Sequence, residues 1–276
     1  MTAVPETVYP AADLALARRL ERAEGTACAA YVDARRELQP DSGSLWIEIA
    51  GAYAMFDGIG SPLTQTFGLG VFEDFLDPQF DRVERFYRER GAPTDHEVCA
   101  LAEPATQELL RLRGYQVIEE SVVLVRPTAA PVSSPPAITV RFAERSETGL
   151  WSRVAGQGWS SESPELGSFM EDFGAVVARA RGVRCFLAEL DGRPVAAAAL
   201  NLANGVALLA GASTIPDARR RGAQQALLAA RLEFSAAMGI DLAMVVTQPG
   251  SGSQRNSERQ GFRPVYTRKK WRLPAA

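Results

Sequence analysis

The residues with the clearest chemical potential are three consecutive arginines that stand directly before a predicted helix. They lie in STIPDARRRGAQQALLAARLEF, residues 213–234. Like charges placed side by side repel one another unless they stay in water or meet an anion. The first backbone N–H groups of a helix have no partner inside it, and the helix dipole favours negative charge there. Guanidinium groups add charge-assisted hydrogen bonds to phosphate oxygens. The pattern therefore predicts a diphosphate site made by Arg219, Arg220, Arg221, Gly222, Ala223, Gln224 and Gln225.

Two familiar phosphate-binding patterns, G-x-x-x-x-G-K-[ST] and a G-x-G-x-x-G after a strand, do not occur in the sequence. The arginine stretch instead resembles the signature [Q/R]-x-x-G-x-[G/A] of the GNAT superfamily of N-acetyltransferases. Arg219 matches the first position and Gly222 the glycine, whereas Gln224 departs from the small residue expected last. The resemblance extends over residues 137–273, because a Gly-Phe pair at 261–262 and the order of strands and helices also fit.

The resemblance implies a mixed α/β fold, acetyl-CoA as co-substrate and no metal. In this family the backbone of the strand before the loop, here Ala212, Ser213 and Thr214, pairs with the pantetheine arm like an added strand. The resemblance also places Asn256, with Ser253 beside it, against the cofactor. The implied reaction is direct attack of an amine on the thioester, with backbone N–H groups of a bulged strand polarising the carbonyl.

The groups that would move protons depart from the pattern of the family. Many members of the family place a tyrosine four residues before the Gly-Phe pair, where this chain has Ser257. Serine is a poor acid, and Tyr266 is the nearest substitute along the chain. A carboxylate often accepts the proton of the amine through water. The candidate bases are Glu162, Glu165, Glu171 and Asp172. We take Tyr266, Ser257 and Glu171 as the candidate catalytic residues.

The elements that must position these residues form two similar halves. A stretch rich in proline and serine, residues 126–140, reads as a linker. In each half a Gly-aromatic pair precedes a proline by 13 positions (127 − 114 and 274 − 261), which favours two copies of one α/β unit. We therefore expect a degenerate GNAT-like domain over 1–127, a linker over 128–137 and a catalytic domain over 138–276. An offset of 148 between the halves puts Asp74 where the second half has Gly222, so the first copy is expected to lack the cofactor loop.

Local patterns predict most of the individual elements. The turn dipeptides Asp191-Gly192 and Asn204-Gly205 each predict a hairpin. The sequence TRKK, residues 267–270, is expected on a solvated strand edge. We expect helices over 14–38, 77–91, 146–159 and 163–180 and after the arginines, and strands over 45–56, 61–71 and 137–144.

Whole-chain properties limit the class of function. With 46% hydrophobic and 23% charged residues the chain belongs with globular proteins. A net charge of −3 gives no overall basic field for nucleic acid. Three widely spaced cysteines favour a reducing compartment, and no apolar run approaches the ~20 residues of a membrane span. We expect a cytoplasmic monomer or homodimer without membrane or nucleic-acid partners. The function expected is acetyl transfer to an amine of unknown identity; a non-catalytic acyl-CoA-binding module is the alternative.

Overall fold

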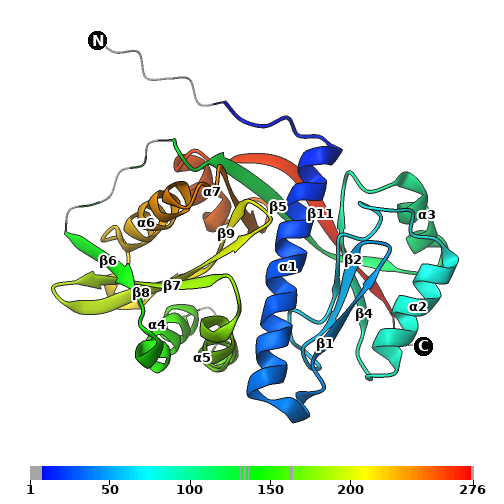
Figure 1. Ribbon diagram of the computed structural model, residues 1–276, viewed down its shortest axis with the longest axis horizontal. Coiled ribbons are helices and arrows are strands. Elements are labelled where there is room, and N and C mark those ends of the chain that lie inside the picture. The colour runs from blue at the N-terminus through cyan, green and yellow to red at the C-terminus, as the bar shows by residue number, and fades with distance from the viewer. Residues whose placement is uncertain (1–7, 131, 133–134, 136, 162–163, 275–276) are drawn as a thin grey trace. The chain divides into compact units, whose positions relative to one another are not determined.

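The computed structural model describes residues 8–130, 132, 135, 137–161 and 164–274 and divides into two compact units (Figure 1). Unit 1 contains Arg126–Ala243, together with Val8. Unit 2 contains Tyr9–Val125 and, in addition, residues 244–274 from the end of the chain. Unit 2 therefore combines the first half of the chain with its last residues, whereas a cut at the linker would separate them.

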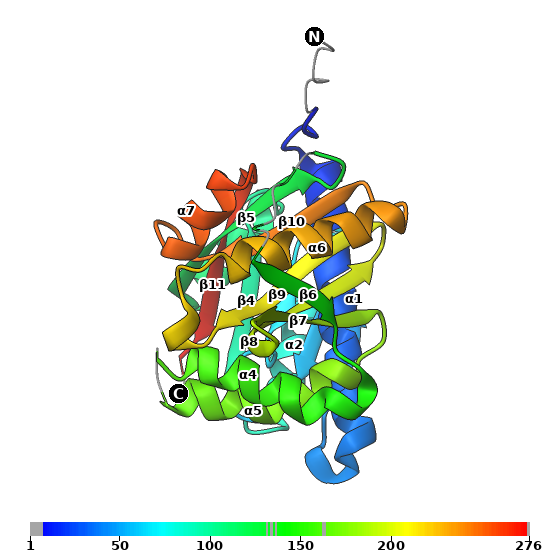
Figure 2. The ribbon, with the colours of Figure 1, turned by 90° about the vertical axis from the view of Figure 1, so that its left-hand side faces the viewer.

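Unit 1 is an antiparallel sheet with helices on both faces. Its elements are β6 (Ile138–Phe142), η2 (Arg145–Glu147), α4 (Thr148–Trp159), α5 (Pro164–Arg179), β7 (Val183–Leu190), β8 (Arg193–Ala203), β9 (Val206–Thr214), η3 (Pro216–Ala218) and α6 (Ala223–Ala237). The strands lie in the order β9-β8-β7-β6. In Figures 1 and 2, α6 lies on one face of these strands and α4 and α5 lie on the other.

The two tight turns of this sheet have the conformation that the sequence predicts. Asp191 and Gly192 adopt φ of 53° and 77°, and Asn204 and Gly205 adopt 50° and 72°. Positive φ at both central residues defines the hairpin turn whose twist matches its strands. Both predicted hairpins are confirmed, and they join β7 to β8 and β8 to β9.

In unit 2, α1 lies on one face of the strands, and α2 and α3 lie on the other (Figure 1). Its elements are α1 (Leu14–Leu38), η1 (Pro40–Ser42), β1 (Leu45–Ile49), β2 (Ala52–Phe56), β3 (Thr66–Phe67), α2 (Asp77–Arg88), β4 (Thr94–Cys99), α3 (Pro104–Leu112), β5 (Gln116–Pro127), α7 (Gly252–Arg259) and β11 (Arg263–Leu273). Strand β10 (Leu242–Thr247) begins in unit 1 and ends in unit 2. The predicted strands over 45–56 and 61–71 are in fact a hairpin of β1 and β2 and the two-residue β3.

The last strand of the chain lies in the middle of the unit 2 sheet. β11 pairs antiparallel with β4 on one side and with β5 on the other. Gly114 and Gly261, the glycines of the two repeated Gly-aromatic pairs, both end helices with positive φ, 84° and 83°. The strands that follow them, β5 and β11, are thus equivalent by sequence and neighbours in space. The prediction that TRKK lies on a strand edge is wrong, because this strand has a partner on each side.

The predicted mixed α/β class is confirmed by these two units. The predicted linker begins close to Arg126, where the chain enters unit 1, whereas residues 244–274 group with the first half. The assignment of a degenerate role to one half and a catalytic role to the other stays a prediction. Among the described residues, no helix is both long enough and apolar enough to span a bilayer.

Candidate functional site

The candidate site begins on β9, which carries a bulge. Ala199 of β8 faces Ala210, and Ala197 faces Ser213, so two steps along β8 (199 − 197) correspond to three along β9 (213 − 210). Gly211, inside this interval, has a φ of 60°. An extra residue interrupts the ladder of hydrogen bonds and turns backbone groups away from the neighbouring strand. The bulge lies directly before Ser213 and Thr214, two of the three residues predicted to bind the pantetheine arm.

Beyond β9 the backbone turns sharply into α6. Arg219 is extended, Arg220 adopts a φ of 62°, and Gly222 adopts a φ of 89° as the N-cap residue of the helix. A positive φ is costly for arginine and easy for glycine. A Cβ at Gly222 would stand 2.6 Å from the side chain of Pro135. Both the backbone angle and this contact therefore require glycine at position 222.

The N-terminus of α6 has no side-chain cap among the described residues. Its first helical hydrogen bond joins the N–H of Ala226 to the carbonyl of Gly222, at 3.0 Å. The amides of the preceding turn have no carbonyl inside the helix, and the helix dipole adds partial positive charge at this end. The arrangement suits an anion.

The three arginines do not play one role. Arg219 turns back into unit 1: its Nη2 donates to the carbonyl of Gly158 at 2.9 Å and to Ser161 Oγ at 2.5 Å, and its Nε donates to the carbonyl of Thr214 at 3.2 Å. Its guanidinium therefore fastens the loop to the end of α4. Arg220 and Arg221 are exposed, and within the described part of the chain neither forms an ion pair. These two guanidinium groups are the ones available to a phosphate.

Other predicted cofactor residues also support the loop. Gln224, which departs from the small residue of the signature, donates from Nε2 to Thr214 Oγ1 at 2.8 Å. Ser213 Oγ donates to the carbonyl of Ala155 in α4 at 3.0 Å. A Cβ at Gly158 would stand 2.4 Å from that hydroxyl, so α4 packs directly on β9. These elements and residues therefore all lie in unit 1: β9, the arginine loop, Ala223, Gln224, Gln225 and the end of α4.

The remaining predicted cofactor residues lie in unit 2, on α7. Ser253 and Asn256 are exposed, and all eight residues of this helix are at least partly exposed. Asn256 Oδ1 accepts a hydrogen bond from Arg259. Ser257 is half-buried, and its carbonyl accepts from the N–H of Phe262 at 3.0 Å. Their predicted contact with a cofactor stays a prediction.

The candidate acid and base are placed very differently. Tyr266 lies on β11, buried, and its hydroxyl donates to Glu21 Oε1 at 2.9 Å. Burial, together with the charge of Glu21, raises the pKa of Tyr266 well above its usual value. Glu171 is exposed on α5, with its backbone packed against Gly156. Glu162 lies outside the described residues. The position of Tyr266 favours a structural partnership with Glu21.

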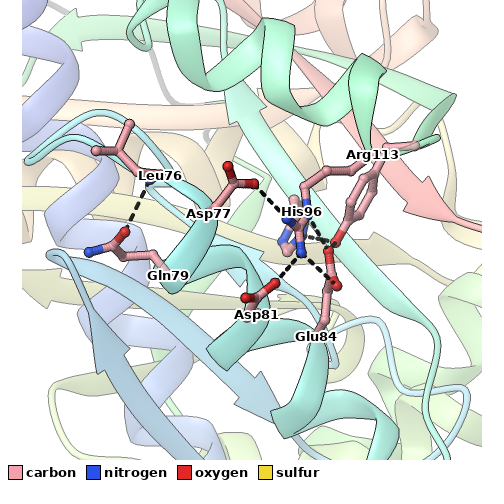
Figure 3. Close-up of polar contacts among 8 residues, drawn as sticks. Leu76, Asp77, Gln79, Asp81, Glu84, His96 and Arg113 are labelled. Atoms are coloured by element: carbon pink, nitrogen blue, oxygen red, sulfur yellow. Dashed lines mark hydrogen bonds and ion pairs between the residues drawn. The ribbon is translucent and has the colours of Figure 1, made fainter.

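Unit 2 has a helix start that corresponds to α6 in the repeat, and acidic side chains surround it (Figure 3). At α2 the side chain of Gln79 accepts from the N–H of Leu76, at 3.2 Å. Asp77 puts a negative charge in the first turn and pairs with Arg113 at 2.6 Å. Asp74, the residue aligned with Gly222, is exposed. A helix start with acidic residues disfavours a phosphate. The loss of the cofactor loop in the first half stays a prediction.

Sequence reasoning missed the residues that hold the loop from behind. The carbonyl of Gly158 and the hydroxyl of Ser161 accept hydrogen bonds from Arg219, and the carbonyl of Ala155 accepts one from Ser213. No local pattern marks a carbonyl as the partner of a distant arginine. Gly211 did carry a signal, since a glycine within a strand often marks a bulge.

A comparison with known protein families finds a match over most of unit 1. Residues 138–246 match the family profile described as "Acetyltransferase (GNAT) domain". Residues 138–246 therefore match the GNAT superfamily of acetyltransferases, and the resemblance predicted from the signature around Gly222 is confirmed. A search of curated proteins found no match.

Solved structures resemble the chain over nearly its full length. A GCN5-related N-acetyltransferase from Kribbella flavida aligns with a TM-score of 0.62 and 18% identity, covering 90% of this chain and 96% of that one. A tandem GNAT protein from the clavulanic acid biosynthesis pathway aligns with a TM-score of 0.59 and 13% identity, covering 98% and 99%. A GCN5-related N-acetyltransferase from Sphaerobacter thermophilus gives 0.55 and 15%, covering 93% and 94%. At these identities the likeness concerns the fold, and it confirms the predicted arrangement of two GNAT-like units.

Proposed function

We propose that the protein is an acetyl-CoA-dependent N-acetyltransferase of the cytoplasm, which transfers an acetyl group to a primary amine of a small molecule or peptide. The observation that carries the proposal is the uncapped start of α6, reached through Gly222 and flanked by the guanidinium groups of Arg220 and Arg221. The helix start carries a partial positive charge, and the two arginines directly before it carry full positive charges. A double phosphate, such as that of coenzyme A, fits this combination.

The family match and the bulge on β9 support the rest of the site. Acetyl-CoA, when bound, supplies an activated thioester. In the proposed reaction the amine nitrogen forms a bond to the carbonyl carbon while the bond from carbon to sulfur breaks. The backbone turned out at Gly211 and Ala212 is suited to donate to the carbonyl oxygen as it gains negative charge. The amine loses a proton, and the sulfur leaves as a thiolate or takes up a proton.

The side chains that would move protons differ from those of many relatives. Ser257 stands where many relatives have tyrosine, and the hydroxyl of Tyr266 is already engaged with Glu21. Glu171 is exposed, so it meets solvent as a base through water would require. The lack of a clear acid favours, as a second candidate, a module that binds acyl-CoA without turnover.

Titration with coenzyme A and an assay for thiol release separate the two candidates. We expect one equivalent of coenzyme A per chain, because α2 begins with acidic residues where α6 begins with arginines. Acetyl-CoA with a panel of primary amines should then release free thiol at a rate that depends on the amine. Binding without release across the panel would favour the non-catalytic module. Absence of binding at saturating ligand would contradict both candidates, and two equivalents would contradict the lost loop of the first half.

A further inference from the structure

The middle of α6 carries a buried arginine that has no role in the site described so far. Arg231 is only 4% exposed. Its Nε donates to the carbonyl of Leu227 at 3.1 Å, and its Nη1 donates to the carbonyl of Ala199, on β8, at 3.1 Å. An arginine buried this deeply normally has a carboxylate as its partner, because an unpaired charge inside a protein is costly.

The charge of Arg231 has no counter-charge. Within the described part of the chain no carboxylate forms an ion pair with this side chain, and both of its hydrogen-bond acceptors are neutral carbonyls. Burial lowers the pKa of Arg231 to about 9, so the guanidinium is still protonated at pH 7. Replacing a buried charge by an apolar side chain of similar volume is often neutral or stabilising. Stability therefore does not explain why a positive charge stands at this position.

The carbonyl that Arg231 contacts on the sheet belongs to the bulge of β9. The carbonyl of Cys185 accepts from the N–H of Ala143 at 2.9 Å, so the backbone of Cys185 faces β6. Ala199 lies opposite Cys185, and its carbonyl therefore points away from β7 and toward β9. On that side Ala199 faces Ala210, the residue at which the bulge begins. Arg231 thus donates to a backbone carbonyl at the border of the bulge.

Small side chains on β8 allow the guanidinium to come this close. Residues 196–199 are all alanine, and all four are buried. Helix α6 packs on β8 and β9. Alanine side chains leave room for an arginine of α6 to reach the backbone of the sheet. The positive charge is therefore held on the α6 side of the bulge, inside the fold, where a low dielectric constant makes a charge act strongly.

From this geometry we propose that Arg231 is a positioning residue for the thioester of acetyl-CoA. Through the carbonyl of Ala199 it fixes the bulge of β9, and its unbalanced charge increases the polarisation of a carbonyl group bound there. The thioester oxygen gains negative charge as the amine attacks, and a positive charge nearby stabilises that state. No bond to Arg231 forms or breaks. This role rests on the proposed function, because it requires acetyl-CoA at the bulge.

Infrared difference spectroscopy tests this role without any acceptor amine. The probe is acetyl-CoA with a heavy isotope at the carbonyl carbon of the thioester. The stretching frequency of a carbonyl falls as the bond is polarised, so we expect a lower frequency in the complex than in free acetyl-CoA. Arg231→Met removes the charge with little change in volume and should return the frequency most of the way to the free value. Arg231→Lys keeps the charge and should retain most of the shift.

Two further measurements separate this role from general support of the fold. Arg231 lies eight residues beyond Ala223 (231 − 223), which is about 12 Å along the helix. Arg231→Met should therefore bind coenzyme A within about twofold of the wild type by isothermal titration, and its melting temperature should not fall. The matched control is Leu232→Val, at a buried apolar position of the same helix. It should lower the melting temperature and leave the carbonyl frequency of the complex unchanged.

The outcomes distinguish this role from the proposed function. If Arg231→Met does not fold, as judged by circular dichroism, Arg231→Gln removes the charge and should raise the frequency in the same way. A wild-type frequency in the folded neutral variant, an equal change in Leu232→Val, or loss of the shift in Arg231→Lys would overturn the role of Arg231 while acetyl-CoA still binds. A wild-type complex without a shift would overturn it too. A wild type that does not bind acetyl-CoA would contradict the proposed function, and this role with it.

Discussion

At the scale of single residues, Gly222 is the position where backbone geometry and proposed function meet. Its φ of 89° and its contact with Pro135 leave no room for a side chain. We expect Gly222→Ala to reduce the affinity for coenzyme A more than tenfold, because the loop must move, and Gly222→Glu to abolish binding by adding a negative charge. Isothermal titration measures both.

The control for Gly222 is Gly192→Ala in the hairpin between β7 and β8. Gly192 has a similar φ of 77°, and a Cβ there would meet nothing within 4 Å. Both alanine variants carry comparable backbone strain, on the order of 1 kcal/mol. If both alanine variants lose affinity for coenzyme A, general destabilisation explains the loss, and the result contradicts a phosphate-binding role of the loop at Gly222.

Two neighbouring arginines should respond in opposite ways to the same change. Arg221 is exposed, so Arg221→Ala should weaken coenzyme A binding by about 1–3 kcal/mol, the contribution of a charge-assisted hydrogen bond, and leave the melting temperature unchanged. Arg219 joins Thr214, Gly158 and Ser161, so Arg219→Ala should lower the melting temperature by several degrees. Calorimetry and thermal unfolding of each variant measure the two effects. Identical behaviour of the pair would refute this division of roles.

At the scale of elements, α2 is tied to its sheet by a chain of polar contacts (Figure 3). His96 Nε2 lies 3.0 Å from the hydroxyl of Tyr115, which donates to Glu84 at 3.1 Å. Glu84 in turn accepts from Arg113 at 2.9 Å. His96 is fully buried beneath α2, and this burial lowers its pKa to about 3.

The lowered pKa of His96 makes stability depend on pH. Between about pH 6.5 and 3 the unfolded chain binds a proton at His96 and the folded chain does not, so acid favours unfolding by up to about 1.4 kcal/mol per pH unit. Glu24 acts in the opposite sense over part of this range, because its pKa is raised. We therefore compare His96→Gln with the wild type, by urea unfolding at pH 7, 6 and 5. As the pH falls, the free energy of unfolding of the variant should rise relative to that of the wild type. If the two free energies change in parallel with pH, His96 does not titrate in this way.

Local elements could be predicted from sequence, and their distant partners could not. The helix over 14–38 and both hairpins follow from capping, periodicity and turn dipeptides, which act over a few residues. The loop before α6 was also recognisable, because a helix start is a local feature. The location of β11 was not, since its register joins Arg268 to Cys99, and no local pattern specifies a partner so far away. Arg268 on this strand is buried, although its place in a run of basic residues predicted an exposed side chain.

At the scale of the whole molecule, the chain cannot be divided at its linker. Residues 1–127 alone lack β11 and would leave β4 and β5 with unpaired edges in the centre of a sheet. We expect this fragment to be unfolded or aggregated by circular dichroism and size-exclusion chromatography. Supplying residues 260–276 as a peptide should restore β structure. A soluble, cooperatively folded fragment without the peptide would contradict the role of β11.

The central place of β11 has a further consequence during synthesis on the ribosome. The ribosome must add 146 residues (273 − 127) after the end of β5 before β11 is complete. At ~5–20 residues per second, this takes about 7–30 seconds. Throughout that interval the nascent first half exposes the unpaired edges of β4 and β5, which only β11 can cover. Premature termination near the 3′ end of the message would thus leave the earliest-made part of the protein as the part that aggregates.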